Sequence, residues 1–147
     1  EYLKKANIEN FPPFIIYRMA GNGFYWQQDY SNAIKYYEKY IGMSKDKHEG
    51  GTNFEEIANM LSVSYIFSGM PEKAKAVLLD VLKSSERKLK KESPQTLATI
   101  YHNLGRAYML ENDKADALKF LNRSSDLQKQ LYGKTGERTL QYINECK

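Results

Sequence analysis

The sequence has little cysteine, histidine or proline, and it contains no long apolar run. Its one cysteine, Cys146, has no second cysteine to pair with, so an intrachain disulfide is excluded. Cysteine usage therefore does not indicate whether the protein works in an oxidising or a reducing compartment. The two histidines share no metal-binding spacing with each other or with the cysteine, so we expect no metal or other cofactor. No stretch approaches the roughly 20 apolar residues that span a bilayer, and no signal-peptide pattern is present. We therefore expect no membrane insertion of this segment.

The four prolines all fall where a helix could begin, at Pro12, Pro13, Pro71 and Pro94. Proline is tolerated in the first turn of a helix because its missing N–H would have no partner there, whereas it breaks a helix interior. This distribution predicts an all-α chain.

The charge balance is mildly basic, with 22 Lys and Arg against 18 Asp and Glu. A net charge of +4 favours acidic partners slightly and does not predict direct binding of nucleic acid. The densest basic run is 87–91. It is either a patch for an anionic surface or the solvated end of a helix, where cations complement the helix dipole, and we favour the second interpretation.

A repeat runs through the chain. Three segments align when Ala33, Ala74 and Ala117 are superimposed, and these alanines are 41 and 43 residues apart. The period of about 42 residues lies in the range of helical repeat proteins, in which each unit buries its apolar faces by stacking on its neighbours.

Each unit reads as two helices joined by a turn. In the third unit Tyr101 and Gly105 belong to an apolar stripe at helical spacing, and the glycine provides a small residue where a second helix approaches closely. The polar residues 111–113 then form a turn, and Ala117 and Leu121 continue on a second helix. The second helices look long, because no helix breaker occurs over 71–91 or 114–132.

The first unit is less regular, because Gly21 and Gly23 both lie inside its expected first helix. Each costs up to about 1 kcal/mol relative to alanine. One glycine matches the small contact position, and the only account of the other is a close approach of a ligand backbone.

We expect one repeat domain over 1–147, with units at 14–50, 53–92 and 94–133 and a partial fourth unit or cap at 136–147. The segment 1–10 reads as the remnant of a preceding helix. Since the chain begins with Glu1, we expect a piece of a longer protein or a mature form without a leader.

The pattern resembles the tetratricopeptide repeat (TPR), and the longer period is similar to that of the kinesin-light-chain-type subgroup. No unit ends in the family's proline, because the second helix continues. The resemblance implies a right-handed α-α superhelix of three TPR-like hairpins plus a partial terminal helix, with a concave groove that binds peptides or helices. The matching residues of the third unit are Tyr101, Leu104, Gly105, Tyr108, Asn112, Asp113, Ala117 and Leu121.

Groove residues are expected on the first helix of each unit, outside the packing stripe. Side-chain amides there can bond a peptide backbone, and arginine can pair with a carboxylate. Trp26, Phe67 and Leu110 share this helical phase, although Trp26 and Phe67 could equally cover the turn between two helices. The candidates are Arg18, Asn22, Tyr25, Asn59, Val63, Ile66, His102, Arg106 and Met109.

Some TPR proteins hold a C-terminal carboxylate in a basic clamp. Arg18 and Asn22 resemble the first part of that clamp, but Met60 and Thr99 stand where Asn and Lys would be needed. We therefore do not expect recognition of the acidic tails of chaperones.

Catalytic motifs are incomplete. The run 133–135 ends like a phosphate loop, but Gln128 stands where the first glycine is required, and Gly21 and Gly23 lack the third glycine of a dinucleotide-binding turn. His48 falls in an expected loop at 45–52, and His102 has no partner in sequence that marks it as a base. We predict that the chain is not an enzyme.

The sequence thus favours a scaffold for a protein or peptide partner. The alternative is a regulatory or sensor segment of a larger signalling or transcription-control protein, and a hydrolase or transferase that uses His102 ranks third. Uncovered end repeats would also allow self-association. The sequence leaves the compartment open, with a cytoplasmic location favoured slightly over a periplasmic or other exported one.

Overall fold

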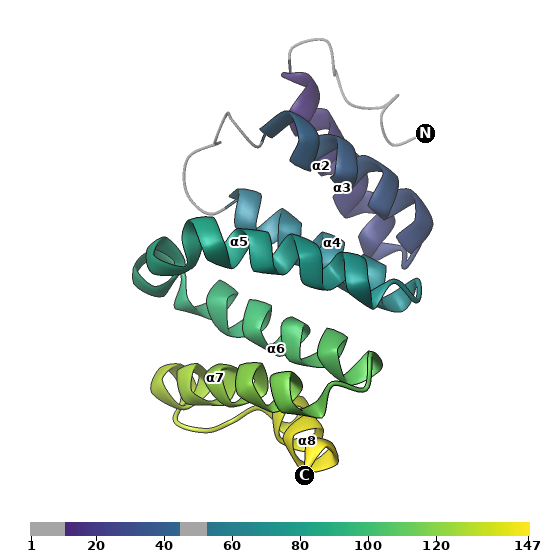
Figure 1. Cartoon of the computed structure of the whole chain (residues 1–147). Helices are drawn as coiled ribbons and strands as arrows, with labels where there is room; N and C mark the ends of the chain where they lie inside the picture. Colours follow the sequence, from purple (N-terminus) through teal and green to yellow (C-terminus); the bar gives the residue numbers. More distant parts are fainter. Residues whose placement is uncertain (1–10, 45–52) are drawn as a thin grey trace.

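The computed structural model describes residues 11–44 and 53–147, and every regular element within them is an α-helix (Figure 1). The all-α prediction is therefore confirmed. The expected helix remnant at 1–10 and the loop at 45–52 that contains His48 lie outside the described residues.

The helices follow one another as antiparallel hairpins, α2 with α3, α4 with α5 and α6 with α7, and α8 packs against the last of them (Figure 1). This confirms the predicted superhelix of three hairpins with a terminal helix. The bounds are α2 (Pro13–Trp26), α3 (Tyr30–Ser44), α4 (Asn53–Phe67), α5 (Pro71–Glu92), α6 (Pro94–Leu110), α7 (Lys114–Tyr132) and α8 (Glu137–Cys146).

The turns inside the three hairpins share one geometry. Gln28, Gly69 and Asn112 each have a left-handed backbone, with φ of 60°, 74° and 62°. The residue after each one donates its backbone N–H to a carbonyl five residues earlier, at 2.8–2.9 Å. These positions are 41 and 43 residues apart, so the period found in the sequence is also the period of the turns. Glycine and asparagine suit a left-handed position, whereas glutamine adopts it less readily.

The core repeats in the same register. Ala33, Ala74 and Ala117 are fully buried, as are the residues four positions after each, which are Tyr37, Leu78 and Leu121. A helix places residues i and i+4 on one face, so each second helix presents a small and a large side chain to its partner.

The array curves toward its first helices. Direct contacts join α2 to α4, α4 to α6 and α6 to α8, whereas within the described residues contacts of that extent do not join α3 to α5 or α5 to α7. Closer spacing on one side of a stack of hairpins makes that side concave. We call the side formed by α2, α4 and α6 the inner face, and the side formed by α3, α5 and α7 the outer face.

Candidate interaction surface

The predicted groove residues lie on the first helices, and eight of the nine are partly exposed. These eight are Arg18, Asn22, Tyr25, Asn59, Val63, His102, Arg106 and Met109.

Ile66 is the exception, because its side chain is only 4% exposed and belongs to the main core cluster. The prediction that it faces a groove was wrong. Helical phase places Ile66 at the edge of the apolar stripe, and an apolar side chain at that edge gains by turning away from water.

Two of the predicted amides are already hydrogen-bonded inside the chain. Asn22 Oδ1 accepts a 2.8 Å hydrogen bond from the Tyr37 hydroxyl, and Asn59 Oδ1 accepts one of the same length from Asn103 Nδ2 on α6. In both cases the amide oxygen already accepts a hydrogen bond from within the chain. The Nδ2 group of each remains the one that can donate to a peptide carbonyl.

His102 and Met109 face α8. His102 Nδ1 lies 2.8 Å from the Thr139 hydroxyl, and the imidazole ring centre is 5.4 Å from that of Tyr142. Met109 packs against the small core cluster that contains Ile143 of α8. In the third hairpin α8 therefore takes up part of the surface that was predicted to be a groove.

The environment of His102 keeps it uncharged at neutral pH. Burial, together with the positive charges of Arg106 and Arg138, lowers its pKa from 6.5 to about 4. A neutral ring bonded to Thr139 fits a role in holding α8 in place.

An aromatic ladder joins the first two hairpins, and Arg106 extends it to the third. Tyr25 meets Trp26 and Tyr30 edge to face, at 5.3 and 6.0 Å between ring centres. Tyr30 of α3 stacks on Phe67 of α4 at 4.8 Å, and the guanidinium of Arg106 on α6 lies 4.8 Å from the Phe67 ring. Rigid aromatic surfaces and arginine are the side chains that most often carry binding energy at protein interfaces.

Tyr30 was missed by sequence reasoning, which considered only the first helices for the binding surface. It is the first residue of a second helix. It follows the left-handed Gln28 by two residues, and the turn brings it beside Tyr25 at the end of α2. Only the geometry of the turn indicates that Tyr30 belongs to this surface.

The last residue of each first helix is a large, exposed apolar side chain. Trp26 ends α2 and is 76% exposed, Phe67 ends α4 and is 52% exposed, and Leu110 ends α6 and is 55% exposed. We call these three residues the helix-end row. A row of exposed apolar side chains at one repeat position is a feature of interaction surfaces.

Within residues 11–44 and 53–147 no three histidine, cysteine or acidic side chains come together as a metal site. None of the helices in this part of the chain combines the length and the apolar character that crossing a membrane requires.

Known families and structures provide an independent comparison. Tetratricopeptide-repeat family models match residues 97–136 and 27–47. Among solved structures, the nearly identical TPR-like repeats assigned to a kinesin light chain of Podosopora anserina match with a TM-score of 0.71 at 18% identity, over 92% of this chain. A single-residue variant of those repeats matches with a TM-score of 0.72 at 19% identity, over 91% of this chain. This chain spans 66% of each of those chains, just under two thirds. No curated protein matches.

The chain contains tetratricopeptide repeats at 27–47 and 97–136, and its stacked hairpins have the fold of a tetratricopeptide-repeat array. The likeness to the kinesin light chain repeats is one of fold. The fold is in general a non-enzymatic scaffold for protein–protein interaction, and in that general sense this chain is a protein-binding scaffold.

Proposed function

We propose that the inner face binds a peptide or helical segment of a partner protein, with the helix-end row as its apolar anchor. The observation that carries the proposal is the aromatic ladder, which joins three hairpins through Tyr25, Trp26, Tyr30, Phe67 and Arg106. Because the ladder crosses the hairpins, an extended ligand would contact all three units at once.

The surface offers complementary groups to such a ligand. Trp26 and Phe67 provide exposed ring faces for apolar side chains. Arg106, whose guanidinium lies 4.8 Å from the centre of the Phe67 ring, can pair with a carboxylate of the ligand. The Nδ2 groups of Asn22 and Asn59 can donate to peptide carbonyls, which would fix the register of the backbone.

The test begins with a peptide library displayed on phage and selected against the intact chain. Affinities of the selected peptides are then measured by isothermal titration for the wild type and for Trp26→Ala and Arg106→Gln. Each substitution should weaken binding by on the order of tenfold, as expected for an anchor residue. Leu79→Ala is the matched control, because Leu79 is an exposed apolar residue on α5, away from the ladder.

Thermal unfolding checks that each variant keeps its fold. Selected peptides that bind equally well to the wild type, Trp26→Ala and Arg106→Gln would place recognition elsewhere on the chain and would overturn the proposal.

A further inference from the structure

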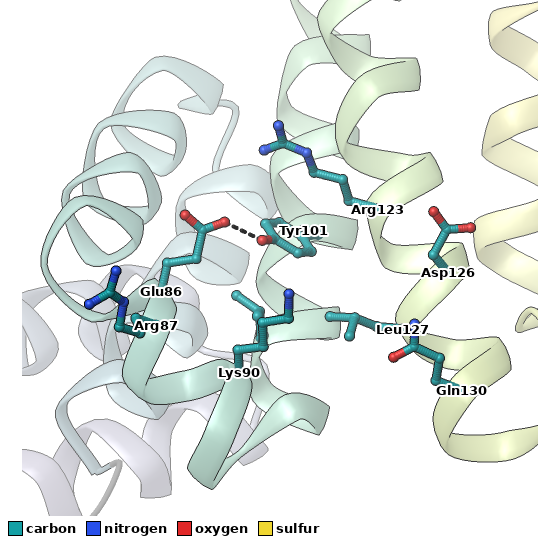
Figure 2. Close-up of a pocket in the computed structure, with 9 residues that line it drawn as sticks. Glu86, Arg87, Lys90, Tyr101, Arg123, Asp126, Leu127 and Gln130 are labelled. Carbon is teal, nitrogen blue, oxygen red and sulfur yellow. Dashed lines mark hydrogen bonds between the residues drawn. The ribbon is translucent and has the colours of Figure 1, made fainter.

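A cleft of about 530 Å³ lies on the outer face, where α5, α6 and α7 meet (Figure 2). Its lining residues are Glu86, Arg87, Lys90, Leu97, Tyr101, Arg123, Asp126, Leu127 and Gln130. Its floor on α6, at Leu97, lies about 20 Å along the helix from Leu110 of the helix-end row, at 1.5 Å per residue. The cleft is therefore separate from the surface proposed above.

The curvature of the array explains why a cleft opens here. The first helices approach one another directly, so α5 and α7 diverge on the outer side and expose the flank of α6 between them. Leu97, Tyr101 and Leu127 are buried at the bottom of the opening. The result is a cleft with an apolar floor and polar walls.

The walls hold three cations and two carboxylates, and two of these five groups are already engaged. Glu86 accepts a short hydrogen bond from the Tyr101 hydroxyl (Figure 2). The guanidinium of Arg123 lies over the ring of Tyr101 at 5.9 Å. Within the described part of the chain neither Arg87 nor Lys90 forms an ion pair, so both cations can pair with a ligand.

The basic run 87–91 can be interpreted either as a patch for an anionic surface or as a solvated helix end, and its residues divide between the two. Lys88 forms an ion pair with Glu55 at 3.0 Å, and Lys91 is an exposed residue in the last turn of α5, as expected of a solvated helix end. Arg87 and Lys90 instead line the cleft. Residues three apart on a helix share a face, so both side chains border the same cleft.

We propose that this cleft binds an acidic peptide segment of a partner protein. The ligand's carboxylates pair with Arg87 and Lys90, and an apolar side chain of the ligand rests on Leu97 and Leu127. This inference does not rest on the proposed function of the inner face.

The carboxylates of the cleft favour a peptide over a nucleic acid. Asp126 can accept a hydrogen bond from a peptide N–H, whereas a phosphate backbone offers only acceptors and negative charge at that point.

The experiment is a fluorescence-anisotropy titration of the chain with a labelled peptide of alternating glutamate and leucine, at low ionic strength. The same peptide with glutamine in place of glutamate is the ligand control. The glutamate peptide should bind the wild type, and binding should weaken as salt is added. Arg87→Gln with Lys90→Gln should weaken it by on the order of tenfold.

Lys83→Gln with Lys91→Gln is the matched protein control. It removes the same charge from exposed positions of the same helix that do not line the cleft. The proposal requires this control to bind the peptide within about twofold of the wild type. Equal loss in both double variants would mean general attraction to a basic protein and would overturn it.

Three further outcomes decide the matter. No binding of the glutamate peptide to the wild type overturns the proposal, as does tighter binding of a single-stranded oligonucleotide of equal charge. Changes in NMR amide chemical shifts that place the bound peptide at residues 86–90 and 123–130 support it. Trp26→Ala, which tests the inner face, should leave binding of the acidic peptide unchanged, so the failure of one proposal is distinguishable from the failure of the other.

Discussion

A Cβ atom placed on Gly21 would lie 2.5 Å from Cδ1 and Cε1 of the Tyr37 ring. The two helices of the first hairpin can approach as closely as they do because position 21 has no side chain. The third hairpin repeats the relationship, since a Cβ on Gly105 would lie 2.5 Å from Cγ of Leu121 and 3.3 Å from the Ala117 carbonyl oxygen. In both hairpins the first helix thus needs glycine where it meets the large side chain that follows the buried alanine by four residues.

Gly21→Ala should destabilise the chain by about 1–3 kcal/mol, because the rigid Tyr37 ring cannot yield without moving α3. Gly23→Ala is the matched substitution two residues away in the same helix. Nothing lies within 4 Å of its added Cβ, so it should stabilise the helix by roughly 0.5–1 kcal/mol. Urea unfolding of both variants measures the two changes. Equal effects of the two substitutions would show that helix propensity, and not the Tyr37 contact, governs position 21.

The hydroxyl of Tyr65 on α4 donates a 2.6 Å hydrogen bond to Glu38 on α3, which ties the second hairpin to the first. Burial and the neighbouring carboxylate both raise the pKa of Tyr65, so the phenol keeps the proton that it donates. Tyr65→Phe should therefore cost about 1 kcal/mol, measured by urea unfolding.

A double-mutant cycle with Glu38→Ala, which removes the acceptor, assigns that loss to the bond, with an expected coupling of roughly 0.5–1.5 kcal/mol. Tyr132→Phe, at a highly exposed tyrosine, is the control and should change stability by less than about 0.5 kcal/mol. Additive effects of Tyr65→Phe and Glu38→Ala would contradict the assignment.

The hairpin architecture could be predicted from the sequence because its determinants are local. The spacing of Ala33, Ala74 and Ala117, the position of each proline and the polar turns all act within one unit. Helical phase also indicated which positions of the first helices are exposed, since it fixes the direction of a side chain on its own helix.

The remaining features depend on how neighbouring helices cover one another, which the sequence of one helix does not encode. Ile66 turned out to be buried, and His102 meets α8. Tyr30 joins the aromatic ladder through a turn. The outer cleft could not be predicted from the sequence, because it is formed by three helices and by the curvature of the whole array.

Glu55, in the first turn of α4, is completely buried and bound by Lys88 Nζ at 3.0 Å. Burial alone would raise the pKa of this carboxyl, but the hydrogen bond from Lys88, with others from its own backbone and from Ser85, lowers it below 4.5. Lys88→Met removes the partner and leaves a buried charge, which should cost roughly 2–4 kcal/mol at pH 7. Lys83→Met, at an exposed lysine of the same helix, should cost much less.

The pH dependence provides a second measure of this pair. A carboxyl whose folded pKa is depressed stabilises the fold above its unfolded pKa, and that stability is lost as the pH falls through the folded value. In Lys88→Met the pKa of Glu55 should rise, because its positive partner is gone. Near pH 4.5 the free energy of unfolding of this variant should then depend less on pH than that of the wild type, or should fall as the pH rises. Parallel pH profiles for the wild type and Lys88→Met would contradict a stabilising pair.

His102 should make the stability of the chain depend on pH between 6.5 and 4. Its folded pKa of about 4 lies below the unfolded value of 6.5, so the unfolded chain binds the proton first. The stability that the neutral ring contributes is complete above pH 6.5 and is lost as the pH falls toward 4. At about 1.4 kcal/mol per pKa unit, the loss has an upper limit of roughly 3 kcal/mol.

The loss should appear first in α8, because the proton would disturb the contacts of His102 with Thr139 and Tyr142 and would add a charge beside Arg106 and Arg138. Hydrogen exchange of the α8 amides, corrected for intrinsic rates, should show falling protection between about pH 7 and 5 in the wild type. His102→Gln should be less stable at neutral pH, and its α8 protection should be nearly independent of pH over that range. A wild-type profile as flat as that of His102→Gln would mean that the imidazole titrates normally and does not hold α8 in place.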